Sequence, residues 1–137
     1  MFRTLLVDDH AGFRASVSDV LRRQFPQVEV DEAGDGPEAL RAIEDCGTDL
    51  VLLDIKLPNG NGIELTKAIK TAHTSVTVVI LTGHDLPQYR QAAFRNGADC
   101  FIYKGSISCM NDVLARVEGA LLARQSTFED ARAVMPK

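Results

Sequence analysis

Two short, mostly apolar segments of the sequence lead directly into carboxylates. Residues 51–53 are followed by Asp54, and residues 4–7 are followed by Asp8 and Asp9. A short run that is apolar at every position is typical of a strand buried on both faces of a parallel sheet. In open α/β sheets, ligands bind at the carboxyl ends of the strands. We therefore expect these three acids to serve chemistry and not packing.

Two further segments end in polar side chains of complementary kinds. Residues 76–81 are β-branched and apolar and lead into Thr82, and residues 101–103 lead into Lys104. Parallel strands present all their carboxyl ends at one edge of the sheet. If these strands are neighbours of the strands that carry the acids, three carboxylates, a hydroxyl and an ammonium group converge at that edge.

Carboxylates that lie so near one another need a cation among them, because otherwise at least one would have to be protonated. Mg²⁺ fits, since it takes oxygen ligands from one or two carboxylates and keeps waters and phosphate oxygens. Lys104 would supply a point charge for a phosphate oxygen, and Thr82 a hydroxyl donor. Positioning and charge neutralisation are most of what phosphoryl transfer requires. Asp54 is therefore predicted to be a nucleophile that accepts a phosphoryl group.

The elements that must position these residues alternate between strand and helix five times. The helices are predicted from apolar stripes at helical spacing, with Pro26 as a stop, Pro37 in a first turn and Asn96-Gly97 as a C-terminal cap. This pattern predicts an α/β fold, a doubly wound five-stranded parallel sheet with helices on both faces. The strands are expected near residues 4–7, 28–30, 51–53, 76–81 and 101–103, and the helices near residues 13–25, 37–43, 63–69, 86–95 and 108–123.

Length, charge and cysteine usage narrow the class of protein. The 137 residues predict one domain over residues 1–124, followed by a tail or linker over residues 125–137. The net charge of −4 argues against direct nucleic-acid binding by this domain. The three cysteines lack the CxxC spacing of a zinc site or a redox dithiol. Because no apolar run approaches membrane-spanning length and the N-terminus lacks a signal pattern, we expect a cytoplasmic protein without membrane contact.

The chain resembles the CheY-like receiver domains of two-component response regulators over roughly residues 5–122. The resemblance rests on the order and spacing of five features: Asp8-Asp9, Asp54, Pro58 with Gly62, Thr82-Gly83 and Lys104. It implies a flavodoxin-like (βα)5 fold with strand order 2-1-3-4-5. Residues 7–10, and Gly105 in place of the family's frequent proline, look more like the NarL/FixJ-type subgroup.

This resemblance implies a role for each residue at the sheet edge. Asp54 would accept a phosphoryl group from a phosphohistidine of a sensor histidine kinase. Asp8, Asp9 and Asp54 would hold Mg²⁺ together with the backbone carbonyl of Lys56. Lys104 would pair with the phosphoryl group. Such a domain is a signalling switch and not an enzyme, although it would assist its own phosphorylation and dephosphorylation.

The resemblance also implies a conformational switch. Thr82 would swing toward the phosphoryl group, and Phe101 would turn inward to fill the vacated space. Lys56 and His84 occupy positions that tune the rate of dephosphorylation, with a sign that the sequence does not fix. The change would reach a surface where receivers form homodimers or meet an output partner, made by the helix at 86–95, the strand at 101–103 and the helix at 108–123.

Other interpretations remain open. Residues 34–39 fit the GxGxxA pattern of dinucleotide-binding enzymes, but Asp35 and Glu38 would face the pyrophosphate and Pro37 lacks an N–H group. An aspartyl-phosphate phosphatase needs a second acid two residues after the nucleophile as its general acid, and this sequence has Lys56 at that position. A pseudo-receiver would be an interaction module without phosphorylation, and the intact acids count against it. The kinase and the downstream target stay open, with transcriptional regulation as the expected output.

Overall fold

Five parallel strands form one sheet in the order β2-β1-β3-β6-β7. The computed structural model describes residues 1–134, and their side chains for residues 1–124. Counted without a small separate hairpin, the strand order is 2-1-3-4-5, so the predicted doubly wound fold is confirmed. The strands are β1 (Phe2–Val7), β2 (Val28–Ala33), β3 (Leu50–Leu53), β6 (Thr77–Thr82) and β7 (Cys100–Tyr103).

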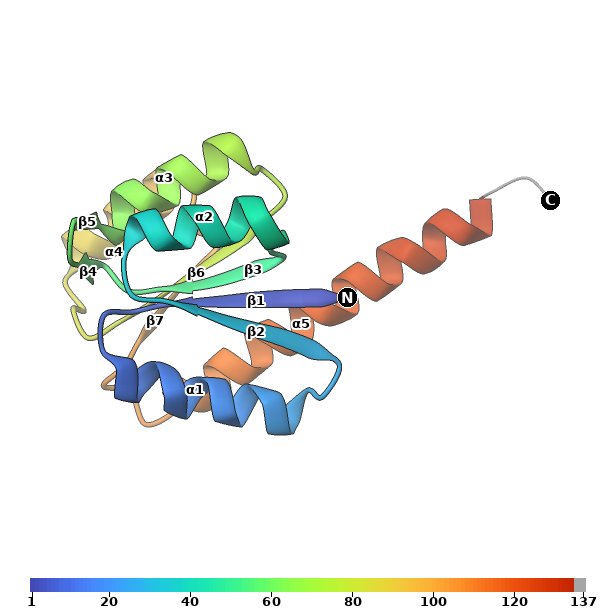
Figure 1. Ribbon diagram of the computed structural model, residues 1–137, viewed down its shortest axis with the longest axis horizontal. Coiled ribbons are helices and arrows are strands. Elements are labelled where there is room, and N and C mark those ends of the chain that lie inside the picture. Colours follow the sequence, from blue (N-terminus) through green and yellow to red (C-terminus); the bar gives the residue numbers. More distant parts are fainter. Residues whose placement is uncertain (135–137) are drawn as a thin grey trace.

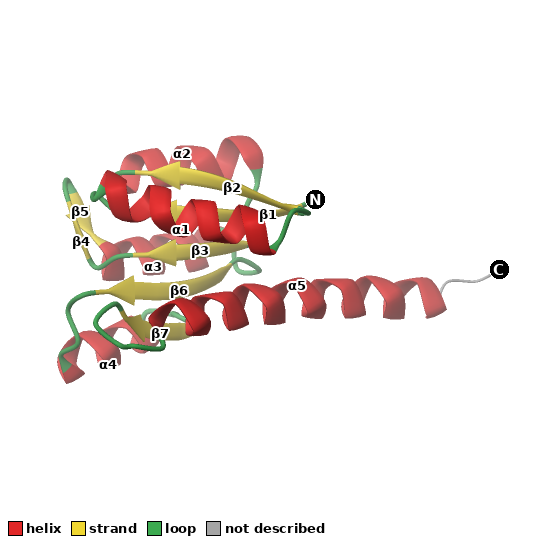
Figure 2. Cartoon of the chain, turned by 90° about the horizontal axis from the view of Figure 1, so that it is seen from below, coloured by secondary structure: helices red, strands yellow, loops and turns green. Residues whose placement is uncertain are grey.

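Helices cover both faces of this sheet (Figure 1). One face carries α1 (Ala11–Gln24) and α5 (Cys109–Val134), and the other carries α2 (Gly36–Cys46), α3 (Gly62–Ala72) and α4 (Pro87–Arg95). Figure 2 views the molecule from below and shows α1 and α5 in front of the sheet, running roughly along the strands. A sheet covered in this way needs apolar side chains on both faces of its central strands.

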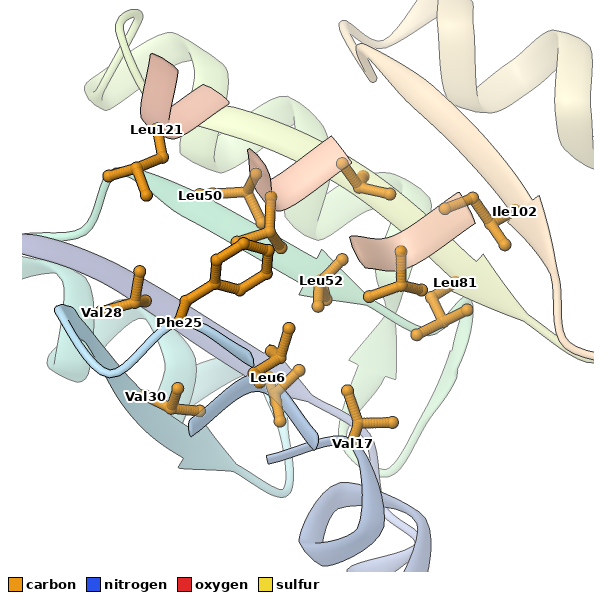
Figure 3. Close-up of a cluster of buried hydrophobic side chains, with 14 of the residues drawn as sticks. Leu6, Val17, Phe25, Val28, Val30, Leu50, Leu52, Leu81, Ile102 and Leu121 are labelled. Carbon is orange, nitrogen blue, oxygen red and sulfur yellow. The ribbon is translucent and has the colours of Figure 1, made fainter. Parts of the chain in front are cut away.

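The buried side chains therefore form two cores, one on each side of the sheet. Neighbouring residues of a strand point to opposite faces, so Leu6 and Leu52 join the core under α1 and α5, whereas Leu5 and Val51 join the core on the other face. Figure 3 shows the first core, in which Leu121 of α5 lies beside Leu50. The central strand β3 is apolar at every position, so its first polar side chain is Asp54, directly after its end.

Two features differ from the expectation. The loop after β3 contains a small antiparallel hairpin, β4 (Lys56–Leu57) paired with β5 (Gly60–Asn61). The expected end of the last helix near residue 123 is wrong, because α5 continues to Val134 and extends past the sheet (Figures 1 and 2). Residues 124–134 contain neither Gly nor Pro, the residues that most often stop a helix.

Strand register brings the predicted site residues to one edge. Val7 is paired with Leu53, and Leu53 with Ile80, so the residues that follow β1 and β3 are adjacent in space. Thr82 is paired with Tyr103, which precedes Lys104. Within residues 1–134, no helix has both the length and the apolar character needed to cross a bilayer.

Two adjacent leucines of α5 offer a test of this packing. Leu121 is 7% exposed in the core, whereas Leu122 is 54% exposed. We expect Leu121→Ala to lower the free energy of unfolding by about 2 to 5 kcal/mol, because it opens a cavity under α5. Leu122→Ala should change it by less than about 0.5 kcal/mol. Urea unfolding followed by circular dichroism measures both, and equal losses would contradict the packing.

Candidate functional site

Asp54 lies directly after β3, in the middle of the sheet, and is only 7% exposed. Its backbone N–H donates to the carbonyl of Val7 at 2.9 Å, which continues the pairing of β3 with β1. Its Oδ1 accepts the N–H of Ile55 at 2.7 Å. One carboxylate oxygen is thus engaged by the local backbone.

Asp8 and Asp9 follow β1 on the adjacent strand. Asp8 is 4% exposed, and its Oδ1 accepts the N–H of His10 at 2.8 Å. Asp9 is exposed. One carboxylate oxygen from each of Asp8, Asp9 and Asp54 lies within 4.8 Å of the others. The structure therefore brings together the three acids that the sequence placed at one edge.

Lys104 supplies the positive charge among these acids. Its Nζ donates to Asp8 Oδ2 at 2.5 Å and to Asp54 Oδ2 at 3.1 Å. Burial alone would lower the pKa of the Lys104 ammonium, but the hydrogen bonds and negative charges of Asp8 and Asp54 outweigh burial and raise the pKa above the usual 10.5. The ammonium also lies 4.2 Å from the centroid of the Phe13 ring. Lys104 is thus held in its charged form between the carboxylates.

Thr82 and Phe101 lie on the neighbouring strands β6 and β7. Thr82 is completely buried, and its Oγ1 accepts the backbone N–H of His84 at 3.3 Å. The backbone carbonyl of Thr82 accepts the N–H of Lys104 at 2.8 Å, so the two residues are fixed to each other. Phe101 is already buried here, with the guanidinium of Arg90 4.5 Å from its ring centroid.

The turn after Asp54 depends on a close backbone approach at Gly62. Its N–H donates to the carbonyl of Ile55 at 2.7 Å. A Cβ atom on Gly62 would lie 2.0 Å from the backbone oxygen of Asp54. The hairpin between them turns at Pro58-Asn59, where Asn59 adopts a positive φ of 59° that Asn tolerates better than most residues. Any side chain at Gly62 would therefore displace the backbone that carries Asp54.

Three site neighbours were not identified from the sequence. The guanidinium of Arg14 donates to the backbone carbonyl of Asp8 and to Glu32, which ties the end of β1 to β2. Phe13 contacts Lys104 as described above, and Tyr89 contacts both Lys56 and His84. The only signal for Phe13 and Arg14 is their position one turn after Asp9. Tyr89 carries no sequence signal of this kind.

The acids fit a divalent cation with oxygen ligands. Three carboxylate oxygens approach one another, and Lys104 neutralises one of the three negative charges. Mg²⁺ takes carboxylate oxygens and keeps waters that a phosphate oxygen can replace. No sulfur or imidazole ligand belongs to this cluster among the described residues, which argues against zinc.

The loop after β2 argues against dinucleotide binding. Asp35 caps α2 by accepting the N–H of Glu38 at 2.9 Å, and the Glu38 carboxylate accepts the N–H of Gly34 at 3.1 Å. This arrangement is a variant of the capping box, because the Glu38 carboxylate binds the amide of the residue before the N-cap and not that of the N-cap itself. The amides that a pyrophosphate would need are therefore bound to the protein's own acids.

Replacement of Gly62 tests the close approach to Asp54. We expect Gly62→Ala to lower the free energy of unfolding by about 1 to 3 kcal/mol, because the new methyl group meets backbone that cannot move away freely. Gly119→Ala is a matched control. A Cβ there meets open space within α5, so stability should rise by about 0.5 to 1 kcal/mol. Chemical denaturation measures both, and an unchanged Gly62→Ala stability would contradict the geometry.

The raised pKa of Lys104 predicts a pH dependence of stability. Because the folded-state pKa lies above the unfolded value, the stabilisation is fully present below pH 10.5 and is lost as the pH rises through the folded-state pKa. We therefore expect wild type to be more stable than Lys104→Met at neutral pH, with the difference shrinking above pH 10.5. Lys67→Met, at an exposed position of α3, is the control. If the difference in stability between wild type and Lys104→Met stayed constant as the pH rises, that result would argue against this charge arrangement.

Comparison with known proteins identifies the family. The family described as "Response regulator receiver domain" matches residues 4–117. The chain is 32% identical over 133 residues to the sensory transduction protein RegX3 of Mycolicibacterium smegmatis, covering 97% of this chain and 56% of the relative. It is 33% identical over 101 residues to the transcriptional regulatory protein DegU of Brevibacillus brevis, covering 73% of this chain and 42% of that relative. The chain thus spans about half the length of these curated relatives.

Solved structures agree with this assignment. A CheY-like response regulator receiver domain protein from Methanospirillum hungatei superposes with a TM-score of 0.82 at 28% identity, covering 93% of this chain and 98% of that one. A two-component response regulator of the LuxR family from Aurantimonas superposes with a TM-score of 0.79 at 30% identity, covering 88% of this chain and 85% of that one. The resemblance seen in the sequence is confirmed, and the chain belongs to the receiver-domain family of two-component response regulators.

Proposed function

We propose that this chain accepts a phosphoryl group on Asp54 from a phosphohistidine of a sensor histidine kinase. The observation that carries the proposal is the ammonium of Lys104 held between Asp8 and Asp54, with Asp9 beside them. In the transfer, an Asp54 oxygen forms a bond to phosphorus while the bond from the imidazole nitrogen to phosphorus breaks. Asp54 Oδ1 is engaged by the amide of Ile55, which leaves Oδ2, the oxygen that faces Lys104, as the nucleophile.

Each neighbouring group has a separate role in this proposal. Asp8, Asp9 and Asp54, with the backbone carbonyl of Lys56, would hold Mg²⁺. When bound, Mg²⁺ neutralises charge on the phosphoryl oxygens and orients them for in-line transfer. Lys104 pairs with another phosphoryl oxygen. Its ammonium already contacts the Asp54 carboxylate. It can therefore shift its contact from the carboxylate to the phosphoryl group with little movement.

The switch begins at Thr82 in this proposal. Its hydroxyl accepts the N–H of His84 in the structure, so turning toward a phosphoryl group breaks that contact and releases the start of the loop to α4. Phe101 lies buried on the adjacent strand, and its ring moves into the space that Thr82 leaves. The result is a change in the surface formed by α4, β7 and α5, which controls an output domain or partner.

A groove on that surface supports a role in association. It lies between β7 and α5 and is lined by Phe101, Asp112, Ala115 and Arg116, among others. Asp112 and Arg116 carry opposite charges one helical turn apart, so two copies related by a two-fold axis can pair them reciprocally. We propose that a homodimer forms here and that transcriptional regulation is the output, as the names of the relatives suggest.

The domain boundaries follow from the same proposal. We propose residues 1–124 as the receiver and residues 125–137 as a C-terminal tail or linker. Of the latter, residues 125–134 continue α5, and residues 135–137 lie outside the described part of the chain. The domain acts as a cytoplasmic signalling switch that assists its own phosphorylation and dephosphorylation, and it does not turn over a separate substrate. It binds no nucleic acid directly, which agrees with its net charge of −4.

Phosphorylation is tested with a small acyl phosphate donor and intact-mass analysis. We expect one phosphate adduct on wild type with Mg²⁺, and none on Asp54→Ala or without Mg²⁺. Asp45→Ala removes an exposed carboxylate of α2 and should leave the adduct unchanged. No adduct on wild type would favour a pseudo-receiver. An undiminished adduct on Asp54→Ala would assign the phosphoryl group to another residue.

A further inference from the structure

The ring of Tyr89 contacts two side chains that come from different loops. Lys56 Nζ lies 5.2 Å from the ring centroid, within range of a cation–π interaction. The ring of His84 lies 6.3 Å away, centroid to centroid, with an angle of 80° between the planes. This edge-to-face arrangement is favourable for aromatic pairs. Tyr89 thus joins Lys56 to His84.

Both contacted residues sit beside the proposed phosphorylation site. Lys56 is the second residue after Asp54, and His84 is the second residue after Thr82. The strands β3 and β6 that precede them are neighbours in the sheet, so the two loops leave the same edge side by side. His84 also donates its backbone N–H to Thr82. The Tyr89 ring therefore bridges the two loops that flank Asp54.

Tyr89 also helps to anchor the start of α4. This helix has nine residues, of which only Ala93 is fully buried. Leu86 at its N-cap makes no side-chain capping bond. Tyr89 lies in the first turns and packs, partly buried, against the core on that face. A helix with so few buried contacts moves easily, so the contacts of Tyr89, together with those of Arg90 to Phe101 and Asp85, help to fix its position.

We propose that Tyr89 is a positioning residue that holds Lys56 and His84 at the rim of the site and so slows hydrolysis of the phosphoaspartate. The proposal rests on phosphorylation of Asp54 as proposed above. In hydrolysis, the oxygen of a water forms a bond to phosphorus and the Asp54 Oδ–P bond breaks. The aspartate leaves as a carboxylate, and both protons of the water stay on the released phosphate.

The effect of the ring follows from the freedom of its two partners. Lys56 and His84 are exposed side chains that would otherwise sample many rotamers. Contact with one ring restricts both, and restricted side chains at the rim leave the attacking water fewer routes. The chemistry of Asp54 itself does not involve the tyrosine hydroxyl, so the ring and not the hydroxyl carries the effect.

The lifetime of the phosphorylated protein tests this role. Wild type and variants are phosphorylated, the donor is removed, and the loss of the adduct is followed by intact mass. We expect Tyr89→Leu to lose phosphate about 2- to 10-fold faster, the range expected for one cation–π and one aromatic contact. Tyr89→Phe keeps the ring and should decay at the wild-type rate. Phe94→Leu changes an aromatic residue of the same helix that is 46% exposed and should also leave the rate unchanged.

A double-mutant cycle separates positioning from general destabilisation. In a Lys56→Met/His84→Gln background, Tyr89→Leu should cause no further acceleration, because its two partners are already gone. Acceleration that persists there, or equal decay of wild type and Tyr89→Leu, would overturn the role of Tyr89 while leaving phosphorylation of Asp54 intact. Absence of any adduct on wild type would instead overturn both proposals.

Discussion

Mutual repulsion of three carboxylates is the constraint around which the site is built. Asp8, Asp9 and Asp54 bring oxygen atoms within 4.8 Å of one another, and such a group is unstable without a nearby cation. Lys104 meets part of this need through contacts to Asp8 and Asp54. The remaining negative charge would favour a divalent cation at this edge of the sheet. The rest of the fold serves to hold these charges in place.

The sheet holds them through its backbone more than through the side chains themselves. Asp54 is fixed to β1 by the carbonyl of Val7, and Lys104 is fixed to β6 by the carbonyl of Thr82. Two apolar cores, one on each face, keep these strands in register. The site residues thus come from four strands that cannot shift independently. A change at one strand end is therefore transmitted directly to its neighbour.

The two loops that flank Asp54 are held in place, whereas α4 is only lightly anchored. The loop after β3 is restricted by the close approach of Gly62 to the Asp54 backbone. The loop after β6 is held by the bond from the His84 N–H to Thr82 and by the contact of His84 with Tyr89. In contrast, α4 buries only one residue completely. A rigid edge beside a lightly anchored helix suits a two-state switch, because a small change at the site can shift the helix without disturbing the core.

The sequence by itself determined the fold and the edge of the sheet at which the candidate site residues meet. Continuous apolar runs such as residues 51–53 are required only in a strand covered on both faces, and the polar residue that ends each run marks the carboxyl edge. Because a parallel sheet collects all these ends on one side, Asp54, Asp8 and Lys104 could be placed together before any coordinates. The end of α5 was missed because the residues after 123 lack the apolar periodicity that marks a buried helix face.

Only the tertiary structure decided how these groups contact one another and which neighbours support them. The two bonds of Lys104 and the bridge made by Tyr89 join residues between 5 and 96 positions apart. No local pattern encodes such contacts, because they depend on side-chain directions set by packing. The need for glycine at position 62 is of the same kind. It arises because the backbone folds back onto Asp54. The sequence shows that position 62 is a glycine, but only the structure shows why a side chain does not fit there.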